Sequence, residues 1–301
     1  MISIDDSSCV RVCEIKTEGI MTNNSISCIK LKIGISTVVE LYLEIPFSND
    51  TFEITAIVHP YTYVNKVLFG SQQGKLQLWN LRSQKMIYEF TGWDSAITVL
   101  EQAPAIDVIA VGLDDGRIFV HNLKTDETLM TFSQEWGSVL AISFRTDGPP
   151  IMASTGRSGN VVLWDLEKRR ILSQMRNIHN GPIYGCEFIN NEPLLVTSSS
   201  DNALKVWIFD QSDNSGRILF DRQGHSAPPT KIKFYGSRGH HVLSAGLDST
   251  LRCFSTLSER LNRNFGFASY DRKHAKKIGV SRDPNRMPPI ADFTTGKTFL
   301  F

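Results

Sequence analysis

The sequence predicts an all-β fold built from repeated four-stranded units, which is the architecture of a β-propeller. Short runs rich in valine, isoleucine and leucine alternate with turns rich in glycine, aspartate, asparagine and serine along most of the chain. No segment of comparable length shows a helical period. A stretch that ends in an aromatic residue also recurs at a spacing close to the length of one propeller blade.

The recurring stretch occurs five times. The copies read "SQQGKLQLWN", "GLDDGRIFVHN", "TGRSGNVVLWD", "SSSDNALKVWIFD" and "AGLDSTLRCFS". Their aligned aromatic positions, 42, 43, 43 and 47 residues apart, are Trp79, His121, Trp164, Trp207 and Phe254. Two apolar strands precede each copy, and a closing strand such as "MIYEF" follows the first four. We expect a sixth, degenerate copy at "IDDSSCVRVCEI", with Cys13 in the aromatic position.

These units predict the domain limits. A β-propeller over 1–256 is expected to comprise a partial blade and five blades, over 1–50, 51–92, 93–134, 135–178, 179–223 and 224–256. Residues 257–301 are predicted to form a basic, proline-containing linker. Residues 15–40 exceed the length of a fourth strand and its connection, which indicates an insertion or an irregularity of the gene model. Because the first blade is partial, we expect an incomplete ring and a chain that is a fragment.

An acidic residue occupies the polar turn of three units. Asp115, Asp201 and Asp248 each stand six residues before the aromatic position, where Gln73 and Ser158 replace them in the other two units. A carboxylate at such a turn can accept backbone N–H groups and hold the hairpin, so the two substituted hairpins should be held more weakly. The indoles of Trp79, Trp164 and Trp207 should then pack between blades. Since these residues are spread around a ring, we interpret them as structural.

The composition sets limits on the kind of protein. Thirty-two basic residues against 31 acidic ones leave no general electrostatic field, so contact with nucleic acid would need a local patch. The five cysteines form no C-x-x-C pair, which favours buried thiols in a reducing compartment. No apolar run reaches the length of a membrane helix, and the N-terminal stretch does not resemble a secretion signal. We therefore expect an intracellular protein without a membrane partner.

The common catalytic signatures are absent from the sequence. It contains no G-x-x-x-x-G-K-[ST], G-x-S-x-G or H-E-x-x-H motif. His240 and His241 are adjacent in a turn, where two imidazoles cannot easily face one ion. We therefore predict no enzymatic activity, no metal, no cofactor and no small-molecule substrate.

The repeated residues resemble those of the WD-repeat β-propeller family. "LWDL" at 163–166 and "LWNL" at 78–81 are close to its defining dipeptide, and "GH" at 224–225 matches its other landmark. The resemblance implies buried, hydrogen-bonded sets of a histidine, a hydroxyl residue, the turn aspartate and the tryptophan. Carried over to this chain, the sets are His179, Thr197, Asp201 and Trp207, and His225, Ser244 and Asp248, with Phe254 in place of the indole.

Several stretches outside that consensus are similar to the WD-repeat subunits of the nucleolar small-subunit processome. Examples are "AIVHPYTYVNKVLFG", "EPLLVTSSSDNALKVWIFD" and "GHSAPPTKIKFYG". The resemblance implies a non-catalytic scaffold for processing of precursor ribosomal RNA and assembly of the small ribosomal subunit. It implies the nucleus and nucleolus as location, and other WD-repeat and helical subunits as partners. Such subunits are much longer and carry tandem propellers and a helical C-terminal region.

Other functions stay open at this point. A substrate receptor of a ubiquitin ligase would carry an arginine directly after the WD dipeptide, and Arg82, Arg169 and Arg170 do not have this spacing. A propeller hydrolase or lyase would need acids or histidines that converge on the central channel.

The C-terminal part differs in composition from the repeats. Residues 258–289 hold eight lysines or arginines against three acids. We interpret them either as a solvated tether or as an RNA contact in which Arg272, Lys273, Lys276 and Lys277 neutralise phosphates. Phe265, Phe267 and Tyr270 could then stack on unpaired bases or pack against the propeller.

Overall fold

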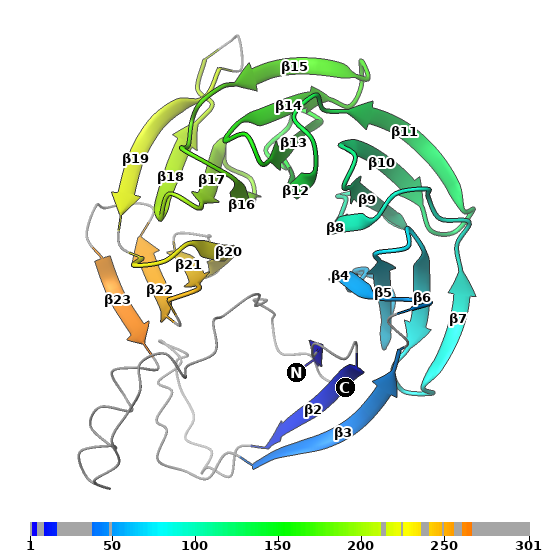
Figure 1. Ribbon diagram of the computed structural model, residues 1–301. Coiled ribbons are helices and arrows are strands. Elements are labelled where there is room, and N and C mark those ends of the chain that lie inside the picture. Colours follow the sequence, from blue (N-terminus) through cyan, green and yellow to red (C-terminus); the bar gives the residue numbers. More distant parts are fainter. Residues whose placement is uncertain are drawn as a thin grey trace, which may run out of the picture.

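The computed structural model describes residues 2–4, 9–16, 38–47, 50–211, 215–223, 225–235, 241–248, 250–255 and 261–266. These residues form five four-stranded antiparallel sheets and one three-stranded sheet around a common centre (Figure 1). No helix occurs among them, and hence none that could span a membrane. The predicted all-β propeller is therefore confirmed, and the ring is not closed.

The five complete sheets, which we call blades, follow one another in chain order. The first contains β4 (Ile54–Val58), β5 (Lys66–Ser71), β6 (Leu76–Asn80) and β7 (Lys85–Glu89). The second contains β8 (Ile97–Gln102), β9 (Val108–Leu113), β10 (Arg117–Asn122) and β11 (Glu127–Ser133). The third contains β12 (Val139–Phe144), β13 (Ile151–Gly156), β14 (Val161–Asp165) and β15 (Arg170–Met175). The fourth contains β16 (Ile183–Phe188), β17 (Leu194–Ser199), β18 (Ala203–Ile208) and β19 (Arg217–Gln223). The fifth contains β20 (Pro229–Tyr235), β21 (His241–Gly246), β22 (Thr250–Ser255) and β23 (Leu261–Gly266).

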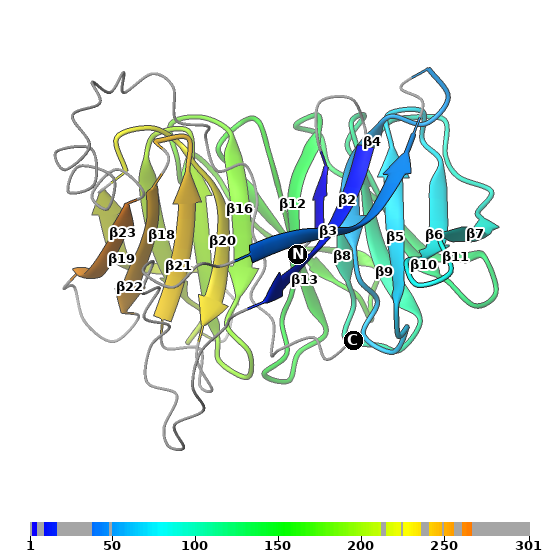
Figure 2. The ribbon, with the colours of Figure 1, turned by 90° about the horizontal axis from the view of Figure 1, so that it is seen from below.

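Each blade runs from the centre of the ring to its rim. The first strand of every blade lies innermost and the fourth lies outermost (Figure 1). Neighbouring innermost strands pack on one another in the order β4, β8, β12, β16 and β20. Since every blade repeats the same antiparallel order, all innermost strands run in one direction, and the loops gather at the two ends of the channel (Figure 2).

A backbone irregularity marks the aligned position in every blade. The pairing of the third strand with the fourth shifts register immediately before the aligned residue, at Trp79, His121, Trp164, Trp207 and Phe254. The same shift stands before Cys13 in the three-stranded sheet of β1 (Ile2–Ile4), β2 (Cys9–Lys16) and β3 (Val38–Pro46). This sheet therefore holds the second, third and fourth strands of a blade. Of the predicted insertion over 15–40, residues 17–37 lie outside the described part.

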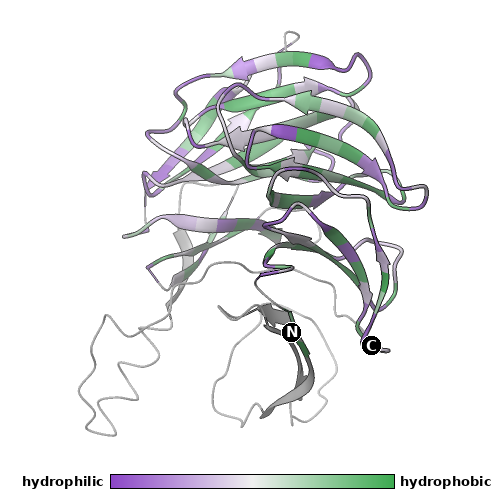
Figure 3. Cartoon of the chain, turned by 45° about the vertical axis from the view of Figure 1, so that its right-hand side comes forward, coloured by the Kyte–Doolittle hydropathy of each residue, from purple (hydrophilic) through white to green (hydrophobic). Residues whose placement is uncertain are grey.

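The hydrophobic core lies between blades. The middle strands are the most hydrophobic, and polar residues gather at turns and on outer strands (Figure 3). Aromatic residues in or directly after an outer strand reach the aligned position of the next blade. Phe47, which follows β3, lies 5.0 Å from Trp79, and Phe132 of β11 lies 5.0 Å from Trp164, between ring centres. Burying one large apolar side chain contributes about 1.5–3 kcal/mol, so each contact helps to hold two blades together.

One boundary differs from the sequence prediction. The fifth blade continues to β23, whose Phe265 pairs with Leu251 of β22, so the outer strand lies inside the segment predicted as a linker over 257–301. The prediction missed this strand because β23, "LNRNFG", contains only two large apolar residues, Leu261 and Phe265. The closing strands of the first four blades, such as "MIYEF", are richer in apolar residues and could be recognised. By composition, β23 is therefore hard to distinguish from a polar linker.

Candidate functional site

A buried polar set lies in the fourth blade and the loop that enters it. His179 precedes β16, and its Nδ1 lies 2.9 Å from an oxygen of Asp201, while its Nε2 lies 2.8 Å from Thr197 Oγ1. A carboxylate only accepts, so Nδ1 carries the proton and Nε2 accepts from the Thr197 hydroxyl. The same hydroxyl oxygen accepts from Trp207 Nε1 at 3.1 Å. The four residues that the resemblance grouped are thus one hydrogen-bonded chain.

Asp201 also accepts hydrogen bonds from two backbone N–H groups, one next to the histidine and one in its own hairpin. The N–H of Asn180 donates to its Oδ2 at 3.1 Å, and the N–H of Ala203 donates to its Oδ1 at 3.0 Å. Burial alone would raise the pKa of Asp201, but these two bonds and the one from His179 outweigh it, so the pKa lies below its usual value. The carboxylate therefore connects the hairpin after β17 to the loop that enters the blade.

The fifth blade repeats this arrangement without an indole. His225 Nδ1 lies 3.0 Å from Asp248 Oδ2, and Nε2 lies 2.7 Å from Ser244 Oγ. The N–H of Ser226 donates to Asp248 at 3.0 Å, and the N–H of Thr250 donates to it at 3.1 Å. Burial lowers the pKa of His225 and of His179 below the usual value, so both imidazoles favour the neutral form.

Sequence reasoning missed a third set, in the third blade. Trp164 Nε1 donates to Ser154 Oγ at 2.8 Å, and Ser154 Oγ donates to Gln134 Oε1 at 3.0 Å. The amide of Gln134 replaces the imidazole of the other two sets. Gln134 stands five residues before its innermost strand, whereas His179 stands four before β16, so an alignment on histidine does not find it. Its amide also donates to the carbonyl of Gly137 at 2.9 Å, which fixes its orientation.

The first two blades lack such sets. Trp79 Nε1 donates to Gln77 Oε1 at 2.9 Å, within its own strand, and Gln73 accepts the N–H of Glu53 at 2.9 Å. Asp115 accepts the N–H of Arg117 at 3.0 Å. His121 is buried, with its Nε2 3.1 Å from Asp126 Oδ1. In the third blade, Ser158 replaces the turn aspartate, and its Oγ accepts a hydrogen bond from the side-chain amide of Asn160 at 2.9 Å.

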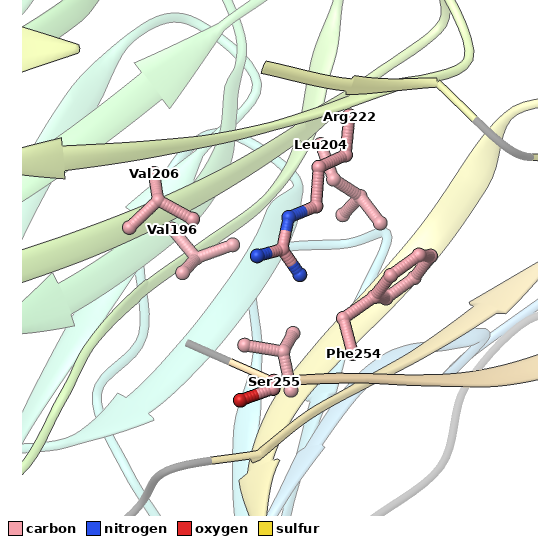
Figure 4. Close-up of a pocket in the computed structure, with 7 residues that line it drawn as sticks. Val196, Leu204, Val206, Arg222, Phe254 and Ser255 are labelled. Atoms are coloured by element: carbon pink, nitrogen blue, oxygen red, sulfur yellow. The ribbon is translucent and has the colours of Figure 1, made fainter. Parts of the chain in front are cut away.

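The fifth blade compensates for its missing indole. Arg222 of β19 pairs with Leu204, at the position where β11 has Phe132 and β15 has Met175. Its guanidinium lies 5.7 Å from the centre of the Phe254 ring and points into a small pocket beside that ring (Figure 4). The remaining lining residues are Val196, Leu204, Val206, Val242 and Ser255. The guanidinium of Arg222 stacked on the Phe254 ring thus stands where a preceding blade interface has an apolar contact such as Phe132 with Trp164.

The sequence also predicted a basic RNA-contact segment and no metal site. The basic residues Arg272, Lys273, Lys276 and Lys277 lie outside the described residues. Within the described ranges, no group of three or more histidine, cysteine, aspartate or glutamate side chains is arranged to hold a metal ion. The side chains of Cys186 and Cys253 are buried.

Comparison with known proteins gives consistent matches. The family model described as the WDR36/Utp21 first β-propeller matches residues 1–210. Over 84% of this chain, the sequence is 49% identical to WD repeat-containing protein 36 of Homo sapiens. Over 83% of this chain, it is 43% identical to the U3 small nucleolar RNA-associated protein 21 homolog of Schizosaccharomyces pombe. It covers 28% of each of these relatives.

A solved structure shows the same fold at lower similarity. The computationally designed Ika8 protein superimposes with a TM-score of 0.57 and 22% identity, over 70% of this chain and 61% of that one. This likeness concerns the fold alone. The family match, over residues 1–210, covers the three-stranded sheet, the first three blades and the first three strands of the fourth blade. The chain belongs to the WDR36/Utp21 family, in the part that the family model describes as its first β-propeller.

Proposed function

We propose that this chain is part of a non-catalytic scaffold of the small-subunit processome, which supports processing of precursor ribosomal RNA and assembly of the small ribosomal subunit. The observation that carries the proposal is the 43% identity to a protein named for association with U3 small nucleolar RNA. The 30% identity to the Saccharomyces cerevisiae U3 small nucleolar RNA-associated protein 21 supports it. The corresponding location is the nucleolus, within the nucleus.

The geometry favours a scaffold because the polar groups of the blades serve the fold. In the two histidine sets, the carboxylates of Asp201 and Asp248 bind a histidine and backbone N–H groups. We assign a structural role to these residues. The full assignment comprises His179, Thr197, Asp201, Trp207, His225, Ser244, Asp248, Asp115, Trp79 and Trp164. Rigid blades of this kind hold loops at both ends of the channel in fixed positions, which suits simultaneous contacts with several proteins.

The partners in this proposal are other WD-repeat and helical subunits of the processome and precursor ribosomal RNA. The RNA contact is assigned to Arg272, Lys273, Lys276 and Lys277. Their positive charge attracts phosphate, and each neutralised phosphate releases counterions.

Affinity purification of the tagged full-length protein from cells tests the proposal. We expect U3 small nucleolar RNA and processome proteins to co-purify, with RNase treatment separating RNA-dependent partners from direct ones. Recovery of a ubiquitin-ligase adaptor without U3 RNA or processome proteins would contradict the proposal and favour the substrate-receptor alternative.

A further inference from the structure

The loops that follow the innermost strands carry exposed apolar side chains. Tyr61 and Val64, after β4, are each 77% exposed, and Ile106, after β8, is 71% exposed. Among the side chains whose exposure the structure describes, no other large apolar one is as exposed. We define the inner-loop face as residues 59–65, 103–107, 145–150 and 189–193; the corresponding loop of the fifth blade, 236–240, lies outside the described residues. Clustered exposed apolar side chains mark interaction sites more often than isolated ones do.

The inner-loop face is held in place by contacts between blades. The side chain of Tyr63 hydrogen-bonds Asp107, which together with burial raises the pKa of Tyr63 and joins the first two loops. The N–H of Asn191 donates to Thr146 Oγ1 at 2.9 Å, which joins the last two. Loops that are ordered before binding lose little conformational entropy when a partner arrives.

The charge of the inner-loop face is negative. Its loops contain three carboxylates, those of Asp107, Asp147 and Glu192, against the single guanidinium of Arg145. Arg145 is buried, and its Nε lies 2.5 Å from Asp147 Oδ1. A surface with this balance attracts cationic side chains and repels the phosphate backbone of RNA.

Further carboxylates lie at the end of the channel beneath these loops. Three innermost strands carry a charged residue at the same register position: Glu101 in β8, Glu187 in β16 and Lys233 in β20. In each of these blades, the aligned residue of the third strand pairs with one residue of the second strand, and the charged residue pairs with the next residue of that second strand. Lys233 Nζ lies 3.4 Å from Glu187 Oε1. The other oxygen, Glu187 Oε2, is buried and has no hydrogen-bond partner. Such an oxygen gains free energy from any donor that reaches it.

Tyr61 connects the apolar loops with this charged end. Burial raises the pKa of the Tyr61 hydroxyl, and the charges of Glu101 and Glu187 raise it further while Lys233 lowers it. The charges of these three groups thus act on the Tyr61 hydroxyl, although most of the side chain is exposed. Aromatic side chains with one polar end are frequent anchors of protein interfaces.

We propose that the inner-loop face binds a protein segment in which apolar side chains flank a lysine or arginine. The apolar side chains contact Tyr61, Val64 and Ile106, and the cation meets the channel-end carboxylates, where Glu187 Oε2 accepts a hydrogen bond. This proposal rests on the proposed scaffold function and names the chemistry of one partner. It assigns protein rather than RNA to this face.

Site-specific photo-crosslinking tests it. A photoreactive amino acid replaces Val64 in the tagged full-length protein in cells, and a matched one replaces Ile87, a 47%-exposed residue of β7 on the rim. We expect position 64, but not 87, to capture a peptide of another protein with a lysine or arginine next to apolar residues. Adducts with RNA, adducts with the same chain, the same peptide at both positions or no adduct at 64 would overturn the proposal.

A pair of matched variants adds a binding measurement on the full-length protein. One carries Tyr61→Ser, Val64→Ser and Ile106→Ser, and the control carries Ile87→Ser, Leu129→Ser and Ile171→Ser on outer strands. We expect the first to bind a synthetic copy of the captured peptide about tenfold more weakly or worse, with an unchanged melting temperature. Equal affinity of both variants would overturn the docking proposal. Co-purification of U3 RNA and processome proteins with both would leave the scaffold function standing, whereas their absence from the wild type would contradict that function itself.

Discussion

The guanidinium of Arg222 stacks on the ring of Phe254, with 5.7 Å between the guanidinium carbon and the ring centre. In the second blade, the position of Arg222 holds Phe132, which contacts Trp164 of the third blade. In the third blade, the same position holds Met175, which shares a hydrophobic cluster with Trp207 of the fourth blade. The change from indole to phenyl in one blade is thus accompanied by a change from an apolar residue to arginine in the blade before it. The two positions form one unit across the blade interface.

This relationship predicts coupling between the two side chains. In a double-mutant cycle with Arg222→Met and Phe254→Leu, we expect a coupling free energy of about 0.5–1 kcal/mol, the value of a partly exposed cation–π pair. Denaturant unfolding of the full-length protein and the three variants provides the measurement. Strict additivity of the two single changes would show that the stacking contributes nothing.

The turn aspartate should matter more than its glutamine counterpart. Asp201→Ala removes the acceptor of His179 and of two backbone N–H groups, and such losses cost about 1–3 kcal/mol. Gln73→Ala removes an acceptor of the N–H of Glu53, in an exposed position. Thermal unfolding of both variants in the complete propeller should show a clearly larger loss for Asp201→Ala. Two equally mild effects would contradict the role of the carboxylate.

Stability should fall on acidification in two steps. The pKa values of His179 and His225 are lowered in the fold, so below the usual value of 6.5 the unfolded chain binds more protons and the free energy of unfolding decreases. The pKa values of Asp201 and Asp248 are lowered as well, so their contribution is present above 3.8 and is lost as pH falls further. His179→Gln, which copies the set at Gln134, should reduce the first step. Unfolding is measured from pH 8 to below the usual aspartate value of 3.8, so that both steps are covered. Curves that are parallel for wild type and variant would refute this.

The isolated chain should associate with itself. The ring is open, so strand edges and blade faces that a closed propeller covers are free to pair with another copy. We expect residues 1–301 expressed alone to be oligomeric or insoluble, and a longer stretch of the full-length protein to yield a monomer. Light scattering after size-exclusion chromatography measures this. A monodisperse monomer that melts cooperatively would show that the ring closes by itself.

The basic segment offers a test of RNA contact outside the blades. Changing Arg272, Lys273, Lys276 and Lys277 to glutamate should weaken RNA crosslinking of the full-length protein and leave the melting temperature unchanged. The difference from wild type should shrink as salt rises, because screening already weakens the wild-type contact. Crosslinking that stays the same at every salt concentration would assign the segment to a solvated tether. Lost assembly with intact RNA contact would assign it to an acidic protein surface.

The sequence by itself determined the all-β class and the repeating unit. Strand periodicity, turn residues and the position of the aromatic are local properties of the chain, and they recur every 42 to 47 residues. The histidines, hydroxyl residues and aspartates of two polar sets could also be named, because their spacing resembles a family pattern. The outer strand β23 could not be recognised, because its sequence "LNRNFG" contains too few apolar residues to show a strand period.

Only the tertiary structure decided which distant residues meet. Gln134 takes the place of a histidine because the loop before β12 turns its amide toward Ser154. Arg222 reaches Phe254 across a blade boundary. Glu187 and Lys233 come from two blades and form an ion pair, and the charge of Glu101 from a third blade acts on both, because the ring brings equivalent positions of separate repeats around one axis. Local pattern specifies the blade, and the packing of blade on blade decides which side chains share a site.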